Sequence, residues 1–401
     1  MNAAEAQESD GYPKIEFEGL IDVRAALASN ATGWFDYGLG KTRYGQGQNI
    51  SDRASLDIAE ASLIIMPQLN YELSSYVHLS YSPEQFKELD VVEAFVNYRP
   101  VSTTANRYEV KAGMFFPPVS LEHTDVAWTS PYTITPSAIN SWIGEEVKTS
   151  GIELSLEHRM EIQTLAFTAA GFVANDPVGS LIAWRGWAMH DVKSTADGRF
   201  PLAPIPAISP TGNLFTMQAP FVEPHHEIDD RVGYYAGLYW DYDGWLTVQG
   251  IHYDNRGSSF DFESGQYAFD TKFSNIGFSA FLPNDMELMG QYMEGESRMG
   301  GTVLDYTFDS YYLMLSRIFN QQRVSLRFDD FASDDKTWIL EDNNNEDGWA
   351  VTAAYTFEFS EQHKLMAEIL YISSDRPGRA DLRLPLEEKE TQLQVSYRYS
   401  F

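Results

Sequence analysis

The 401-residue sequence has no cysteine, no long apolar run and few basic residues. The lack of cysteine excludes disulfide frameworks, thiolate metal sites and cysteine nucleophiles, and it fits a protein that crosses an oxidising compartment before folding. No apolar stretch reaches the roughly 18 residues that a transmembrane helix needs. Lys and Arg number 28 against 58 Asp and Glu, which gives a net charge of −30. This balance argues against nucleic-acid binding, because a phosphate backbone needs clustered basic side chains.

Alternation of apolar and polar residues is the main feature that is present. At the end of the chain Leu393, Val395, Tyr397, Tyr399 and Phe401 alternate with polar residues. A period of two indicates a strand with one apolar and one polar face. The same pattern recurs along the whole chain, and it predicts an all-β protein.

Sixteen segments show this pattern, and an even number suits a closed single-chain barrel. Fourteen or eighteen strands are the alternatives, since boundaries read from a sequence shift by a few residues. The segments are 14–27, 54–67, 73–82, 89–99, 107–117, 148–158, 162–175, 229–241, 244–256, 265–282, 285–297, 305–319, 322–332, 347–359, 363–374 and 388–401.

The connections between the segments alternate in length. Short turns, such as 241–244 and 283–285, follow every second segment, and long polar connections, such as 118–147 and 176–228, follow the others. Transmembrane barrels have short periplasmic turns and long extracellular loops. Because lipid-facing and lumen-facing residues alternate in their strands, the mean hydropathy of such proteins is low. The sequence therefore predicts one domain, residues 1–401, that forms a transmembrane antiparallel β-barrel.

The stretch GMFFPPVSLE at 113–122, together with this strand plan, resembles the phosphate-selective porin O/P family of Gram-negative outer membranes. The resemblance implies a sixteen-stranded, homotrimeric channel without a cofactor, surrounded by outer-membrane lipid and lipopolysaccharide. The terminal aromatic Phe401 resembles the signal that the barrel-assembly machinery reads in such proteins. The implied location is the cell outer membrane.

In general porins the loop after the fifth strand folds inward, so residues 119–147 are the candidate constriction loop. Its alternatives are a cap over the pore or a contact between subunits. The longer connection 176–228 is expected to form an extracellular lid or a plug, and either segment can form the constriction. The candidate constriction residues are Glu122, Asp125, Trp128, Trp142, Glu145 and Glu146.

Parity along the strands assigns a set of basic residues to the lumen, because charges facing lipid cost several kcal/mol each near the midplane. The candidate pore-lining residues are Arg24, Arg99, Lys111, Arg323, Arg327 and Arg398. Opposed to the acidic loop, they would set up a field that sorts solutes by charge. The alternative is that these charges only neutralise one another. The resemblance to the phosphate-selective family implies a preference for anions. Inward acids such as Glu93 and Asp329 and the net charge instead favour a weak preference for cations.

Known catalytic motifs are missing: there is no Gly-x-Ser-x-Gly, His-Glu-x-x-His or phosphate-binding loop. The pair His225–His226 lies among acids, but its spacing matches no metal site, so no metal or catalytic residue is predicted. The sequence thus predicts a porin, not an enzyme, that passes small hydrophilic solutes or ions. The rivals are a barrel enzyme of the lipase or protease type and a soluble, secreted β-rich carbohydrate-binding protein.

Overall fold

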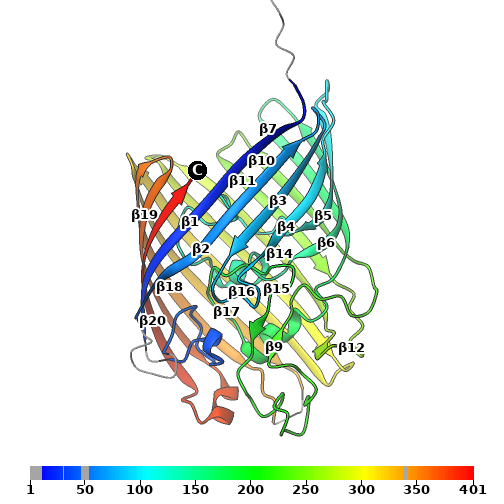
Figure 1. The fold of residues 1–401 in the computed structure, drawn as a ribbon, viewed down its shortest axis with the longest axis vertical. Helices are drawn as coiled ribbons and strands as arrows, with labels where there is room; N and C mark the ends of the chain where they lie inside the picture. Colours follow the sequence, from blue (N-terminus) through cyan, green and yellow to red (C-terminus); the bar gives the residue numbers. More distant parts are fainter. Residues whose placement is uncertain (1–10, 30, 47–53, 338, 340) are drawn as a thin grey trace, which may run out of the picture.

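A computed structural model describes residues 11–29, 31–46, 54–337, 339 and 341–401. Sixteen antiparallel strands, each hydrogen-bonded to its neighbours in chain order, form a closed barrel (Figure 1). The predicted fold class and strand number are confirmed. Within the described residues, no helix is long and apolar enough to cross a membrane.

The barrel strands are β1 (Lys14–Ala28), β2 (Ala54–Gln68), β3 (Leu73–Tyr81), β4 (Leu89–Tyr98), β5 (Asn106–Phe115), β6 (Thr149–Arg159), β7 (Gln163–Val173), β10 (Gly233–Tyr242), β11 (Leu246–Asp254), β14 (Asp270–Leu282), β15 (Met286–Met299), β16 (Leu304–Phe319), β17 (Gln322–Asp335), β18 (Glu346–Ser360), β19 (His363–Asp375) and β20 (Glu387–Ser400). The loops carry two short hairpins, β8 (Phe200–Pro201) with β9 (Phe221–Val222) and β12 (Phe262–Glu263) with β13 (Gln266–Tyr267). They also carry α1 (Ala138–Ile143) and the short helical turns η1 (Trp34–Asp36), η3 (Leu181–Arg185) and η4 (Pro377–Leu382).

The outer face of the barrel is apolar because every second strand residue points outward. Exposed apolar side chains that make up this face include Leu156, Phe167, Leu238, Ile276, Leu313, Leu326, Ile369, Leu393 and Val395. Most of their neighbours in the strands are polar or small, although a few, such as Met314 and Leu370, are buried apolar residues. An apolar exterior with a polar interior is the arrangement of a barrel that sits in lipid.

The first and last strands close the barrel. Strand β1 pairs with β20 from Leu20 opposite Ser400 to Ala28 opposite Gln392. Beyond β20, Phe401 exchanges two backbone hydrogen bonds with Gly19, at 3.0 and 3.1 Å. The Phe401 ring fills the space over Gly19, where an added Cβ would lie 2.2 Å from Cζ of the ring. A side chain at position 19 therefore fits only if the Phe401 ring moves.

Short turns and long loops lie at opposite ends of the barrel. In Figure 1 the C-terminus and the start of β1 lie at the upper end, and η1, η4, β9 and β12 lie in the long loops at the lower end. Several short turns use residues with positive φ, among them Asp243, Asn284 and Asn320. Asn and Asp tolerate this conformation well, which explains why the turns can be so short.

Two predicted boundaries differ by more than three residues. Strand β10 begins at Gly233 rather than at 229, and the larger difference concerns β14. The segment 265–282 divides into β13 and, from Asp270 on, the barrel strand β14. Gly265 adopts φ +84° in the hairpin turn that precedes β13. Because the hairpin strand also alternates, the pattern gave no sign that the barrel strand begins only at Asp270.

The interior at the long-loop end is filled by loop residues rather than open. Buried apolar side chains from several loops and from the wall form one large cluster. Its largest members, Trp34, Trp142, Trp184 and Trp187, are all fully buried and come from three different loops. A sixteen-stranded barrel is too wide for wall side chains alone to fill, so these loops supply the packing.

Candidate functional site

The connection between β5 and β6, residues 116–148, turns into the barrel and is called the constriction loop below. It carries α1, which packs against β16 and β17 on the opposite wall. Ser137 caps this short helix by accepting a hydrogen bond from the backbone N–H of Asn140 at 3.2 Å. Residues of the predicted segment 119–147 thus contact the wall strands β16 and β17, and their role as the constriction stays a prediction.

A buried ion pair holds the constriction loop to the wall. Arg327 of β17 donates to Glu122 at 2.9 Å and to Asp329 of its own strand at 2.8 Å. The same guanidinium donates to the carbonyl oxygens of Thr135 and Pro136, both at 2.9 Å. Arg327, Glu122 and Asp329 are 0 % exposed, so these charges neutralise one another away from water.

Other wall side chains hold the loop along its length. Tyr132 donates to Glu287 of β15 at 3.0 Å, and Glu368 of β19 accepts from the backbone of Ile134 at 2.6 Å. Lys364 of β19 pairs with Asp125 at 2.6 Å. The constriction loop thus lies against the β15–β20 side of the lumen.

Arg398 is also buried under this loop. It donates to the carbonyl oxygen of Ser130 at 3.0 Å and pairs with Asp22 of β1 at 3.1 Å. Asp22 in turn pairs with Arg24 at 2.6 Å. The three side chains form a buried row across the β1–β20 seam. The predicted role of Arg24 and Arg398 in lining an open pore stays a prediction.

The connection between β7 and β10, residues 174–232, also enters the barrel and is called the second loop. Arg185 of this loop pairs with Glu146 of the constriction loop, and His190 hydrogen-bonds the same carboxylate at 2.9 Å. Trp142 of the constriction loop packs edge-on against Trp187, with ring centroids 6.2 Å apart. The second loop therefore packs against the constriction loop, and its role as a lid or a plug stays a prediction.

Asp191 attaches the second loop to the β1 side of the wall. It pairs with Arg24 at 2.6 Å and with Arg43 at 2.9 Å, and nearby Lys193 pairs with Glu60 of β2 at 2.6 Å. Burial alone would raise the pKa of Asp191, but Arg24 and Arg43 outweigh burial and hold that pKa well below its usual range. The attachment therefore stays charged at any physiological pH.

Sequence reasoning missed Arg43, Arg185, Asp191 and Lys193. They sit in loops, where no alternation assigns a direction to a side chain. One signal was available in the second loop: the run Trp184–Thr195 mixes tryptophans with charged residues. Tryptophans in a long connection indicate burial, and buried charges need partners.

Trp128 and Glu145 pack the constriction loop internally. Trp128 stacks between the rings of Phe116 and His123, at 5.2 and 5.3 Å, and donates to the carbonyl oxygen of Gly144 at 2.7 Å. His123 hydrogen-bonds Glu145 at 2.9 Å through Nε2. Trp128 remains partly exposed, and its predicted contact with solutes stays a prediction.

Ser120, His123 and Glu145 form a chain of the types found in hydrolases. Ser120 Oγ lies 2.6 Å from His123 Nδ1. However, Ser120 Oγ also accepts the backbone N–H groups of Glu122 and His123, at 3.1 and 3.3 Å. Its lone pairs are thus used to shape the turn, whereas a nucleophile needs one free toward the substrate. The arrangement is better explained as a turn than as a catalytic triad.

Three carboxylates, of Asp176, Glu227 and Asp229, lie within 4.8 Å of one another at the base of the second loop. Each accepts a backbone N–H, for example that of Ile228 at 2.6 Å to Asp176. Burial, with the two neighbouring acids, raises the pKa of Asp176 to about 7. His225 is separate: it contacts Ser150 and the Lys148 carbonyl at 3.1 Å, and burial lowers its pKa to about 3.

The remaining candidate residues lie nearer the short-turn end and are partly exposed. Arg323 donates to Ser316 at 3.1 Å and covers the ring of Tyr132 at 4.8 Å. Lys111 pairs with Glu153 at 2.9 Å.

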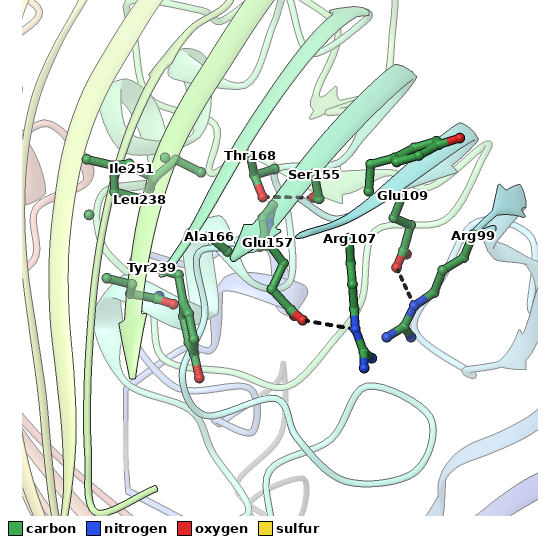
Figure 2. Close-up of a pocket in the computed structure, with 15 residues that line it drawn as sticks. Arg99, Arg107, Glu109, Ser155, Glu157, Ala166, Thr168, Leu238, Tyr239 and Ile251 are labelled. Carbon is green, nitrogen blue, oxygen red and sulfur yellow. Dashed lines mark hydrogen bonds and ion pairs between the residues drawn. The ribbon is translucent and has the colours of Figure 1, made fainter. Parts of the chain in front are cut away.

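Arg99 lines a cavity of about 260 Å³ next to the start of the constriction loop (Figure 2). Arg99 faces Glu109 and Arg107 faces Glu157, with N–O distances of 3.8 and 3.9 Å.

No family model and no curated protein matches this sequence. Solved structures do match in shape. The outer-membrane channel DcaP of Acinetobacter baumannii superposes with a TM-score of 0.62 at 9 % identity, over 98 % of this chain and 99 % of that one. The trimer form of OmpT, an outer-membrane protein of Vibrio cholerae, gives 0.54 at 9 % identity, over 98 % and 100 %. An anion-selective porin from Comamonas acidovorans gives 0.51 at 14 % identity, over 97 % and 100 %. The chain thus has the fold of outer-membrane porins.

Proposed function

We propose that this chain is an outer-membrane channel through which small hydrophilic solutes diffuse passively. The observation that carries the proposal is the closed sixteen-stranded barrel with an apolar outside, a polar inside and loops folded into the lumen. Only a membrane gives such an exterior a favourable environment, and a polar lumen suits water and solutes. The shared fold of a named outer-membrane channel and an anion-selective porin adds support.

The two inward loops set the size limit in this proposal. They are held by buried ion pairs on both sides of the barrel, Arg327 with Glu122 and Arg24 with Asp191. Loops that are held so firmly leave a narrow passage, so the channel should conduct in small steps and exclude larger solutes.

In this proposal, only charged side chains that remain exposed can sort solutes by their charge. Arg24, Arg327 and Arg398 are neutralised by buried acids, whereas Arg99 and Arg107 lie at the mouth. The net charge of −30 enriches cations near the protein. We therefore expect a weak preference for cations.

The partners follow from the same proposal. The apolar outer face fits outer-membrane lipid and lipopolysaccharide, and the strand ending in Phe401 fits recognition by the barrel-assembly machinery. The trimer form of a protein with this fold supports a homotrimer.

Single-channel recording tests the proposal. The purified protein in a planar bilayer should give steady, small ohmic steps in KCl, and a salt gradient should give a reversal potential on the cation side. An anion-side reversal would reverse the charge assignment. An electrically silent bilayer, with protein that migrates as a folded barrel on an unboiled gel, would contradict the channel.

A further inference from the structure

The cavity at the short-turn end has a lining suited to binding. It lies between the strands β4–β7, β10 and β11 and the start of the constriction loop. Its lining includes Arg99, Arg107, Glu109, Glu157, Tyr239 and Pro118. Figure 2 shows the arginine and glutamate head groups gathered on one side of the cavity. Solutes that move between this mouth and the constriction pass this lining.

The ion pairs of the cavity differ from those that hold the loops. Arg327–Glu122 and Arg24–Asp191 are buried and make hydrogen bonds or contacts of 2.9 and 2.6 Å. In the cavity the Arg99 and Arg107 side chains are 52 % and 38 % exposed, and their N–O distances of 3.8 and 3.9 Å exceed hydrogen-bonding distance. Arg99, Arg107 and Glu109 thus attract their partners without hydrogen-bonding them. Glu157 also accepts a hydrogen bond from Nε of Arg159 through Oε1, which leaves its other oxygen, Oε2, for a further donor.

The strand register arranges the charges in alternation. Arg107 of β5 stands opposite Glu157 of β6, and Glu109 stands two residues further on the same face of β5. Arg99 follows β4 directly and faces Glu109. Arg99 and Arg107 thus lie beside Glu109 and Glu157 at a cavity of about 260 Å³, and Arg159 at the end of β6 pairs with Glu157 as well.

We propose that this cavity is a binding site for small zwitterionic solutes, namely α-amino acids or short peptides. This inference rests on the proposed channel function. The solute carboxylate binds the forked N–H groups of Arg99 and Arg107, which suit a carboxylate geometrically. The solute ammonium binds between Glu109 and Glu157. A solute with only one charge leaves one half of the site without a partner.

The binding is expected to be weak, as a channel requires. Half-exposed side chains gain little from a further charge in a watery mouth, and a solute that binds tightly would not leave. Such a site raises the local concentration of zwitterions below the constriction.

The experiment measures block of the KCl current by glycylglycine added on the side of the short turns. N-acetylglycine lacks the ammonium, and glycinamide lacks the carboxylate, at similar size. We expect glycylglycine to block at lower concentration than either compound. The double variants Arg99→Gln/Arg107→Gln and Glu109→Gln/Glu157→Gln should each raise its half-blocking concentration about tenfold, the loss of roughly one charge-assisted hydrogen bond.

The control is Arg256→Gln, which removes an exposed arginine from a loop at the other end and should leave block unchanged. Equal block by all three compounds, or unchanged block in both double variants, would overturn the zwitterion site while the KCl current upholds the channel. A silent bilayer would contradict the channel function alone. In that case, the site is tested by calorimetry of glycylglycine binding to the detergent-solubilised protein and to both double variants. Weaker binding to both variants would support the site, and equal binding would overturn it.

Discussion

Arg327 is the residue on which the constriction loop depends most. Its fully buried guanidinium donates to side chains of the loop and the wall and to two loop carbonyl groups. An isolated buried charge costs far more than a paired one. Removing either Arg327 or one of its acidic partners alone would therefore leave a buried charge without its partner.

Replacing Arg327 by methionine should destabilise the protein by about 3–5 kcal/mol, because Glu122 and Asp329 are then buried without their cation. The measurement is the denaturant midpoint at which the unboiled protein loses its folded mobility on a gel. Arg317→Met, at an exposed arginine of the next strand, is the matched control and should change little. Equal midpoints for the two variants would show that the pair contributes nothing.

Asp176 should make stability depend on pH. Its pKa is raised to about 7, above the usual carboxyl value of 3.8, so the folded protein holds a proton that the unfolded chain has released. Stability should therefore fall as pH rises from about 4 to 7.

Asp176→Asn should remove this slope and raise the melting temperature by a few degrees at pH 8. Asp230→Asn, at an exposed neighbour, should keep the slope. Thermal denaturation at pH 5 and pH 8 compares them, and a slope that persists in Asp176→Asn would locate the titration elsewhere.

The sequence predicts the direction of a strand side chain far better than its partner. Alternation alone pointed Arg24, Arg327 and Arg398 inward, because the neighbouring apolar residues need the outer face. Nothing in the pattern indicated that Asp191 or Ser130 would meet them, since those residues lie in loops without periodicity.

At the scale of elements, the second loop is attached on two sides. One attachment is to the constriction loop through Arg185 and Glu146, and the other is to the wall through Asp191. Lys148 links the loops further by donating to the Ser194 carbonyl at 2.9 Å. The second loop can move away from this side of the wall only if the contacts of Asp191 and the pair of Lys193 with Glu60 break.

Asp191→Asn should loosen the wall attachment by about 3 kcal/mol and raise the single-channel conductance, because the two arginines lose a shared buried anion. In the unchanged protein the wall attachment through Asp191 should persist at both pH 7 and pH 5, since the pKa of Asp191 lies well below its usual range. Asp197→Asn, an exposed acid of the same loop, is the control. Equal conductance in both variants would mean that the second loop does not limit the passage.

Strands could be predicted and loop paths could not. Only the likeness to general porins predicts that residues 119–147 turn inward. For 176–228 the sequence does not distinguish a lid from a plug. The deciding contacts, such as Trp142 with Trp187, join segments that are distant in sequence. A period of two predicts which face of a strand each residue occupies, and it carries no information on contacts between loops.

At the scale of the whole molecule, the seam between β1 and β20 decides whether the barrel exists. Gly19→Val should weaken closure, because a side chain there collides with the Phe401 ring. We expect a smaller folded fraction on unboiled gels after refolding into detergent. Ala25→Val, on the same outward face of β1 but exposed, should fold normally. Equal folded fractions would show that the Phe401 ring is readily displaced.

The seam joins residues at the two ends of the chain, such as Gly19 and Phe401. Until β20 arrives, β1 and β19 each present a row of unpaired backbone groups, and such open edges recruit other chains into aggregates. Closure therefore joins residues far apart in sequence, such as Arg398 and Asp22, which are 376 residues apart, and this makes it slow. In a chain without β20, the edges of β1 and β19 both stay unpaired. Such a chain should therefore aggregate instead of forming a closed barrel.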